Sequence, residues 1–350
     1  MSLTVLQVAY PFAAAGPDEV GGAEQVLSAI DVGLTGAGHR SLVLARAESA
    51  VSGTLIGVSL PERTVAGSLW GEAHRRWREE IGRVLPEVDV VHFHGGDYDR
   101  YLPPEGPPAL VTLHLPLAWY APEALQPTRA RTWLHCVSST QRIAATGMPP
   151  TPLLPEIENG VPVDRLGARV RPRRYALVLG RICPEKNVHA ALDAGRRAAI
   201  SVLVAGRVFP YESHVAYFRE QVAPRLDDRR RFLGPVSFER KRRLLAGARC
   251  LLVPSLAPET ASLAAMEALA SGTPVVAYAS GALPSIVDHG RTGFLVRDSD
   301  AMANAIEACG SLDREYCRAV ARERFPLDRM VTRYLETYQA LAESALEPAA

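Results

Sequence analysis

The stretch Pro254–Val296, PSLAPETASLAAMEALASGTPVVAYASGALPSIVDHGRTGFLV, is the most informative part of the chain. It carries two carboxylates, Glu259 and Glu267, at the start and end of a segment of small residues that favours a helix. Apolar strand candidates, Cys250–Pro254 and Pro274–Ala279, flank this segment. A helix would place the two carboxylates about two turns apart, roughly 12 Å along its axis. Backbone amides at its N-terminus would suit an anionic group such as a diphosphate.

The bulk composition limits the class of protein. A chain of 350 residues suits two domains, and 47% hydrophobic with 22% charged residues is typical of a soluble globular protein. The net charge of +1 argues against a general nucleic-acid binder. We expect no signal peptide and no transmembrane segment. Five scattered cysteines without CxxC spacing indicate reduced packing thiols and favour a cytoplasmic protein: Cys136, Cys183, Cys250, Cys309 and Cys317.

The first half of the chain alternates short apolar strands with helical segments, which predicts a parallel sheet covered on both faces. A Gly-containing loop and a helix near 23–35 follow the first strand. The expected strands are Thr4–Ala9, Ser41–Ala45, Val88–His94, Ala109–His114 and Trp133–Ser138.

The Pro-, Gly- and Arg-rich segment Asn159–Arg174 is interpreted as a linker, after which the alternation restarts. The expected strands there are Tyr175–Gly180, Ser201–Gly206, Arg231–Val236 and Cys250–Pro254, and the expected helices are Lys186–Ala199, Tyr211–Pro224 and Phe238–Gly247. This order predicts two Rossmann-like α/β domains, residues 1–162 and 163–325, with a C-terminal helical segment, 326–350, packing back on the first. Ligands of such sheets bind beyond the carboxyl ends of the strands, so we expect the site in a cleft between the domains.

The spacing of Glu259 and Glu267, with the following SGTPVVA and TGFLV, resembles the E-x7-E motif of retaining glycosyltransferases of family 4 (group 1), which have the GT-B fold. Upstream, Gly180–Asn187 (GRICPEKN) resembles the family motif G-R-x-x-x-E-K-(G/N). The resemblance covers essentially the whole chain and is more specific in the second half. It implies transfer of a hexose from a UDP- or GDP-linked sugar to a hydroxyl of a glycan, lipid or small molecule, with retention of anomeric configuration.

By this resemblance, the donor site combines several motifs. Glu259 would contact the hydroxyls of the donor sugar and Glu267 those of the ribose. Arg181 and Lys186 would neutralise the diphosphate, as fixed cations can. The amides near Ser262 and Leu263 would help to bind it, the loop with Gly234 and Val236 would contact the base, and Gly21 and Gly22 the phosphate or sugar. His114 would lie near the reacting sugar, so Glu259, His114, Arg181 and Lys186 form the expected catalytic set.

The resemblance implies no metal and no cofactor, since the nucleotide sugar is a substrate. Thr260-Ala261-Ser262 stands where many members have glycine and an aromatic residue, which leaves the sugar preference open. Two alternatives also stay open: a nucleotide-sugar 2-epimerase of the same fold, and a non-catalytic nucleotide-sugar-binding protein. The expected partners are the donor and a hydroxyl acceptor, with no nucleic acid.

Other charged and aromatic groups have less specific interpretations. The histidines 92, 94, 114 and 135 fit no common zinc spacing, so packing roles are expected for His92 and His135. Asp97-Tyr98-Asp99 resembles a metal motif of a different glycosyltransferase fold and is interpreted as a loop. A helix over 68–85 is expected to dock on the first domain, with a membrane-surface role as the alternative. The clusters Arg229–Arg231 and Arg240–Arg243, the latter including Lys241, are interpreted as solvated faces.

Overall fold

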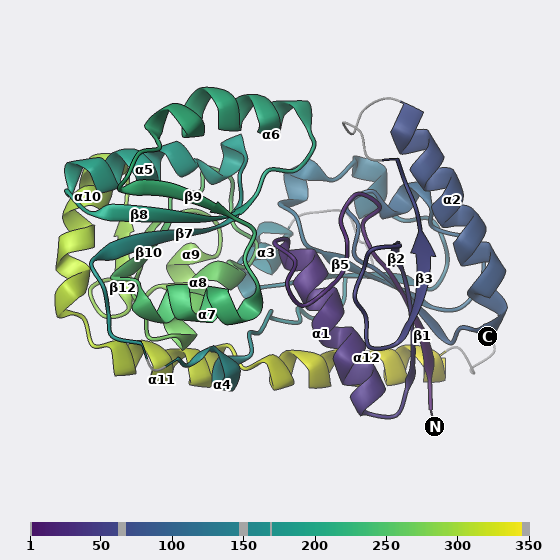
Figure 1. Ribbon diagram of the computed structural model, residues 1–350. Coiled ribbons are helices and arrows are strands. Elements are labelled where there is room, and N and C mark those ends of the chain that lie inside the picture. The colour runs from purple at the N-terminus through teal and green to yellow at the C-terminus, as the bar shows by residue number, and fades with distance from the viewer. Residues whose placement is uncertain (1, 62–67, 147–152, 169, 345–350) are drawn as a thin grey trace. The chain divides into compact units, whose positions relative to one another are not determined.

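The computed structural model describes residues 2–61, 68–146, 153–168 and 170–344, and its chain divides into two units (Figure 1). Unit 1 comprises Met1–Glu158 and Arg329–Ala350, and unit 2 comprises Asn159–Asp328. The boundaries therefore lie at 158/159 and 328/329, beside the expected divisions at 162/163 and 325/326. Among the described residues, no helix combines the length and apolar character needed to cross a membrane.

Unit 1 is built on a six-stranded parallel sheet in the order β3-β2-β1-β4-β5-β6. The strands are β1 (Thr4–Val8), β2 (Arg40–Arg46), β3 (Thr54–Val58), β4 (Val90–Phe93), β5 (Ala109–Leu113) and β6 (Thr132–Cys136). The central strands are buried except for Thr4 at the start of β1, which explains their continuous apolar sequences. β3 was missed in the sequence because this edge strand is only partly buried.

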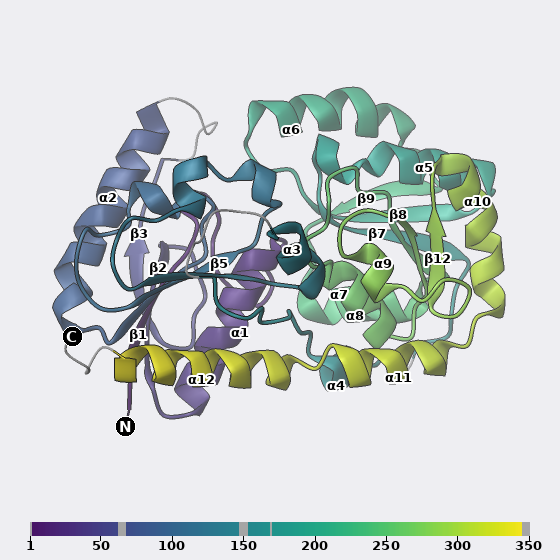
Figure 2. The same ribbon diagram turned by 180° about the vertical axis from the view of Figure 1, so that it is seen from behind.

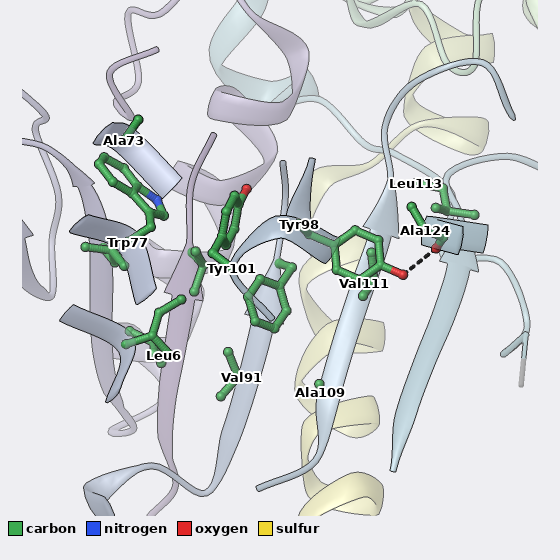
Figure 3. Packing of buried hydrophobic residues seen from close by; sticks show 14 of the residues in the cluster. Leu6, Ala73, Trp77, Val91, Tyr98, Tyr101, Ala109, Val111, Leu113 and Ala124 are labelled. Carbon is green, nitrogen blue, oxygen red and sulfur yellow. Dashed lines mark hydrogen bonds between the residues drawn. The ribbon is translucent and has the colours of Figure 1, made fainter. Parts of the chain in front are cut away.

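Helices cover both faces of this sheet. They are α1 (Gly22–Gly36), α2 (Ser68–Val84), α3 (Ser139–Ala144) and the C-terminal α12 (Leu327–Ser344), which runs beneath the strands in Figure 2. α2 packs its apolar stripe into the main core, as expected: Trp77 is fully buried and its indole nitrogen donates to the Ala9 carbonyl at 3.0 Å. Tyr98 and Tyr101 extend the same core, with the Tyr98 hydroxyl bonded to the Ala124 carbonyl (Figure 3).

Unit 2 repeats the architecture with a parallel sheet in the order β12-β11-β10-β7-β8-β9. Its strands are β7 (Tyr175–Arg181), β8 (Ser201–Arg207), β9 (Arg230–Gly234), β10 (Cys250–Val253), β11 (Val275–Tyr278) and β12 (Gly293–Val296). α5 (Val188–Arg197), α6 (Glu212–Tyr217) and α10 (Ser299–Ala308) lie on one side, as Figure 1 shows. α7 (Phe238–Gly247), α8 (Leu263–Ala270) and α11 (Arg314–Arg324) lie on the other, and α4 (Val163–Leu166) and α9 (Leu283–Ile286) complete the set.

Three expected elements of unit 2 differ from the observed ones. The expected linker contains α4, which packs on α8 and α11, with Leu166 fully buried. The helix expected over 186–199 is interrupted at Asn187, whose φ of 53° is left-handed, and starts only at Val188. The helix expected over 211–224 is α6 followed by a π-helical turn, Phe218–Val222, and a short 3₁₀ turn that contains Pro224.

Candidate active site

The loop after β7 presents the two predicted cations at the carboxyl end of the strand. Arg181 is the last residue of β7, and Lys186 ends the 3₁₀ turn Pro184–Lys186. Asn187 then takes the left-handed conformation that Gly and Asn adopt more readily than other residues. This backbone requirement gives a physical reason for the Gly-or-Asn position that closes the motif.

Lys186 and Glu259 form a close ion pair. The Lys186 ammonium lies 2.5 Å from a carboxylate oxygen of Glu259, and the Ser255 hydroxyl donates to the same oxygen. The Glu259 side chain is only 9% exposed, whereas Lys186 is 31% exposed. Burial alone would raise the pKa of Glu259, but Lys186, Ser255 and the nearby Arg181 together lower it below its ordinary value. Glu259 is therefore a carboxylate at neutral pH, next to two cations.

Glu259 does not lie on a helix, so the expected axial spacing of two helical turns is wrong. α8 begins only at Leu263, and Glu259 belongs to the loop between β10 and α8. Gly281 fixes this loop: the Ala282 amide donates to the Glu259 carbonyl at 2.7 Å, and a Cβ on Gly281 would overlap the Glu259 backbone. Gly281 also has φ of +58°, so the loop needs glycine there for two reasons.

Glu267 lies inside α8 and pairs with Lys241 of α7. The Lys241 ammonium is 2.5 Å from a Glu267 carboxylate oxygen, and the side chains are 9% and 3% exposed. The interpretation of Lys241 as part of a solvated face is therefore wrong. Arg230, in the other basic cluster, is also mostly buried and bonds to Asp227 through its Nε at 2.9 Å.

The remaining donor-side residues of unit 2 occupy loop or helix-end positions. Ser262 is the residue before α8 and Leu263 its first residue; both are buried, and the Ser262 side chain does not cap the helix. The Ser262 carbonyl accepts from the Met266 amide at 3.1 Å. Gly234 ends β9 with φ of +70°, and Val236 follows it as a partly buried residue.

Gly21 and Gly22 lie at the N-terminus of α1, as predicted. Gly21 is the residue before the helix, and Gly22 is its first residue. The Glu24 carboxylate folds back over Gly21 so closely that a Cβ there would overlap it. The first turn of this helix therefore carries an acidic side chain, which suits the positive end of the helix dipole.

His114 follows β5 and lies against His94, which follows β4. The Nδ1 of His94 is 3.1 Å from the Nε2 of His114, and the two rings are stacked. Burial lowers the pKa of His114 to about 3, so this ring is neutral at physiological pH. The Nε2 of His94 is buried and has no hydrogen-bond partner among the described residues.

His92 and His135 belong to a hydrogen-bonded network whose proton positions can be assigned. His135 Nδ1 donates to the Cys136 carbonyl at 3.0 Å, so its neutral ring accepts at Nε2 from the Thr112 hydroxyl at 2.6 Å. That uses the single proton of Thr112, so His92 donates from Nε2 to Thr112 and accepts at Nδ1 from Tyr338, both at 2.7 Å. The network joins β4, β5 and β6 to α12 and confirms packing roles for both histidines.

Unit 1 should lose stability on mild acidification, because burial lowers the pKa of His135 to about 4 and that of His114 to about 3. The unfolded chain binds protons near pH 6.5 and the folded chain does not, so this stability is present above pH 6.5 and is lost as the pH falls through that value. For each ring, we expect the free energy of unfolding to be about 2 kcal/mol lower at pH 5 than at pH 7. Tryptophan fluorescence during urea unfolding measures this selectively, because residues 70, 77, 119 and 133 are the only tryptophans and all lie in unit 1.

The matched variant His135→Gln removes one titrating ring. This variant should be less stable than the parent chain at pH 7, and its free energy of unfolding should decrease less between pH 7 and pH 5. An unchanged slope would contradict the assignment of a low pKa to His135 in the folded state.

The other charged motifs of unit 1 have structural partners. Asp97 accepts from the Tyr101 hydroxyl at 2.9 Å and lies 2.8 Å from His74 Nε2. Arg75 and Arg76 pair with glutamates one turn away on α2. Within the described ranges, neither Asp97 and Asp99 nor the four histidines bring three ligand atoms together as a metal would require.

The sequence of unit 2 matches a known family. Residues 173–311 match the model of the family described as glycosyl transferases group 1. Unit 2 therefore carries a group 1 glycosyltransferase domain. This span includes Arg181, Lys186, Glu259 and Glu267 as well as Lys241, whose importance the sequence analysis missed.

Curated relatives match over parts of their length. A D-inositol 3-phosphate glycosyltransferase of Nocardioides sp. is 39% identical over 116 residues, which cover 31% of this chain and 25% of the relative. A phosphatidyl-myo-inositol mannosyltransferase of Mycobacterium leprae is 30% identical over 208 residues, or 54% of each chain. The chain thus spans at most about half the length of these two relatives.

Solved structures establish the fold over nearly the whole chain. Sucrose-phosphate synthase from Thermosynechococcus elongatus superposes with a TM-score of 0.81 at 18% identity, covering 97% of this chain and 100% of that one. Anabaena HepE, solved with UDP and glucose, gives 0.73 at 20% identity, covering 96% and 99%. The GT-B fold expected from the sequence is confirmed: two six-stranded parallel sheets, each surrounded by helices.

Proposed function

We propose that the chain is a retaining, metal-independent hexosyltransferase that moves a sugar from a UDP- or GDP-linked donor to an acceptor hydroxyl. The observation that carries this proposal is the Lys186–Glu259 ion pair beside Arg181, on loops that follow β7 and β10. These loops lie at the carboxyl ends of parallel strands, where ligands of α/β sheets bind. They also belong to the group 1 glycosyltransferase domain.

The charges of this cluster suit a nucleotide diphosphate. Without a donor, Lys186 and Glu259 satisfy one another. A bound donor would offer Lys186 a phosphate oxygen and Glu259 the sugar hydroxyls, so each partner exchanges one charged contact for another. Arg181, Lys186 and the first-turn amides of α8 would then stabilise the negative charge that develops on the leaving phosphate. We assign no covalent nucleophile, and the departing phosphate would take the proton of the acceptor hydroxyl.

For His114 and for the glycines Gly21 and Gly22, which lie in unit 1, the proposed donor contacts rest on the motif resemblance alone. His114 is neutral and so can donate or accept a hydrogen bond with a sugar hydroxyl without adding charge. Gly234 and Val236 would contact the base, and Glu267 the ribose. These roles rest on the motif resemblance together with the positions described above.

The first test is turnover with donors and acceptors suggested by the relatives' names. We expect release of nucleoside diphosphate from GDP-mannose or UDP-glucose with an inositol 3-phosphate or phosphatidylinositol acceptor, with the anomeric configuration of the product retained by NMR. Excess EDTA should leave turnover intact, because Arg181 and Lys186 take the role of a metal. Loss of nearly all turnover in EDTA, restored by Mg²⁺ or Mn²⁺, would refute the metal-independent mechanism. If the sugar of the donor is released only as free sugar with every acceptor tested, the proposed transfer to an acceptor is refuted.

A second test separates the two glutamates along the donor. Glu267→Gln should weaken both the bare nucleoside diphosphate and the intact donor by about tenfold, because a charge-assisted hydrogen bond to ribose becomes a neutral one. Glu259→Gln should leave the bare diphosphate nearly unchanged and weaken the intact donor. Calorimetric titration of both ligands measures this. Equal effects on both ligands in both variants would mean that the glutamates do not lie along a nucleotide sugar.

A further inference from the structure

Three side chains of unit 2 with metal-binding chemistry converge beside the loop that carries Arg181 and Lys186. They are Cys183 and Glu185, on that loop, and His214, on α6. One ligand atom from each, the thiol sulfur, a carboxylate oxygen and a ring nitrogen, lies within 4.8 Å of the other two. The sequence analysis interpreted Cys183 as a packing residue and did not consider the other two as ligands.

Two atoms of this group are buried without a partner. The Oε2 of Glu185 and the Nδ1 of His214 have no hydrogen bond among the described residues. His214 is only 7% exposed, and Cys183 is fully buried. Buried polar atoms are ordinarily paired, so unpaired atoms on two of the three converging side chains indicate that a ligand can bind there.

We propose that Cys183, Glu185 and His214 bind a zinc-like divalent ion. Sulfur, imidazole nitrogen and carboxylate oxygen are the donors that zinc takes in proteins. Zinc holds such donors at about 2.0–2.3 Å, so tetrahedral ligands lie roughly 3.4–3.6 Å apart. The three donors therefore need to approach one another by only about 1 Å. Three protein ligands leave the fourth position for water or another small ligand.

The protonation states at neutral pH suit this binding. Burial lowers the pKa of His214, so its ring is neutral. Glu185 is a carboxylate, because burial, which would raise its pKa, is outweighed by its own amide, Cys183 and charged neighbours. Burial raises the pKa of Cys183 to about 11, so the ion must displace its proton to solvent. The thiolate and the carboxylate then cancel the two charges of the ion, which makes it acceptable near the positive Arg181.

The site would connect α6 to the phosphate-binding loop. The Cys183 carbonyl accepts from the Lys186 amide at 3.1 Å, and the Glu185 carbonyl accepts from the Leu256 amide at 2.9 Å, next to the Glu259 loop. An ion bound here would stabilise this turn, while Glu259 holds Lys186 without it. No residue assigned to phosphate or sugar binding is a ligand, so this inference is independent of the proposed function.

The test uses the full chain, stripped of metal, with Zn²⁺ or Co²⁺ as the probe. Equilibrium dialysis should show one Zn²⁺ per chain, and Co²⁺ should give a thiolate-to-metal charge-transfer absorption with tetrahedral ligand-field bands. Zn²⁺ should raise the midpoint of thermal unfolding, and Mg²⁺ should not. His214→Gln and Cys183→Ser should each weaken Zn²⁺ binding by about 100-fold or more, since even indirect ligand partners cost 10- to 100-fold.

The matched controls are His289→Gln, in the same unit, and Cys136→Ser, in unit 1; both should bind Zn²⁺ as the parent chain does. His214→Gln keeps the inference testable if Cys183→Ser fails to fold. No binding, binding that survives His214→Gln, or an equal response to Mg²⁺ would overturn the proposal. An absence of Zn²⁺ binding would mean that water alone bridges the unpaired atoms of Glu185 and His214.

Discussion

Replacing Lys241 by methionine is expected to destabilise unit 2 by about 3–5 kcal/mol, because it leaves the Glu267 carboxylate buried without its charged partner. The methionine keeps the length and apolar stem of lysine, so the loss reports on charge and not on a cavity. Unit 2 contains no tryptophan, so its unfolding is followed by calorimetry or circular dichroism, with the tryptophan signal of unit 1 as an internal reference. Arg243→Met, at an exposed position of the same helix, should change stability by about 0.5 kcal/mol or less.

The double variant Lys241→Met with Glu267→Leu separates stability from binding. Apolar replacement of a whole buried ion pair is often neutral, so most of the lost stability should return. If Glu267 also holds the ribose, the refolded double variant should still bind nucleoside diphosphate about 10- to 100-fold more weakly. Recovered stability with unchanged nucleotide affinity would show that Glu267 is only a partner of Lys241. If Lys241→Met alone is as stable as the parent chain, the Lys241–Glu267 pair is solvated.

The loop after β7 lies beside the Glu259 loop, as the sequence predicted, because its position follows from the strand order. Parallel strands end at one edge of the sheet, so the loops after β7 and β10 must be neighbours although about 70 residues separate them in sequence. The Leu256 amide bonds to the Glu185 carbonyl across these loops, which brings Lys186 to Glu259. A motif at a strand end therefore predicts proximity, even without any knowledge of the side-chain geometry.

The local shape around Glu259 could not be read from its neighbours. Small residues from 257 to 270 have helical propensity, but the helix starts at Leu263. The loop conformation instead depends on Gly281 and Ala282, more than 20 residues downstream. Such tertiary contacts override local propensity, and no periodicity in the Glu259 segment reports them.

Lys241 did leave a signal in the sequence. Lys241 and Leu245 are four residues apart and therefore share one face of α7, and both are buried. The cluster of arginines around Lys241 concealed this spacing. For the histidines the reverse holds, because the packing roles of His92 and His135 were predicted but not their partners on α12. Tyr338 bonds to His92 and Tyr334 bonds to Thr112 of the same network, each more than 200 residues later in the chain.

Arg181 and Lys186 differ in how the ligand-free protein uses them. Lys186 is held by Glu259, whereas Arg181 acts on Glu259 through its charge, and its guanidinium forms no hydrogen bond with the described residues. Both side chains are partly exposed, so neither is needed to fill a core. The contribution of Arg181 should therefore appear in turnover and not in stability, whereas Lys186 also supports the buried Glu259 carboxylate.

Arg181→Ala and Lys186→Ala are each expected to lower kcat by about 10²-fold or more, the usual effect of removing a fixed charge that stabilises the transition state. The thermal midpoint of Arg181→Ala should stay close to that of the parent chain, whereas that of Lys186→Ala should fall, because the Glu259 carboxylate is only 9% exposed and loses its charged partner. Arg196→Ala, at an exposed position of α5 in the same unit, is the matched control and should keep full turnover. Lys186→Ala also frees the Glu259 carboxylate, so Lys186→Ala with Glu259→Gln should bind the bare diphosphate better than Lys186→Ala alone, since it removes an unpaired negative charge beside the phosphates. Near-normal turnover in either single variant would show that the loop after β7 does not bind the diphosphate.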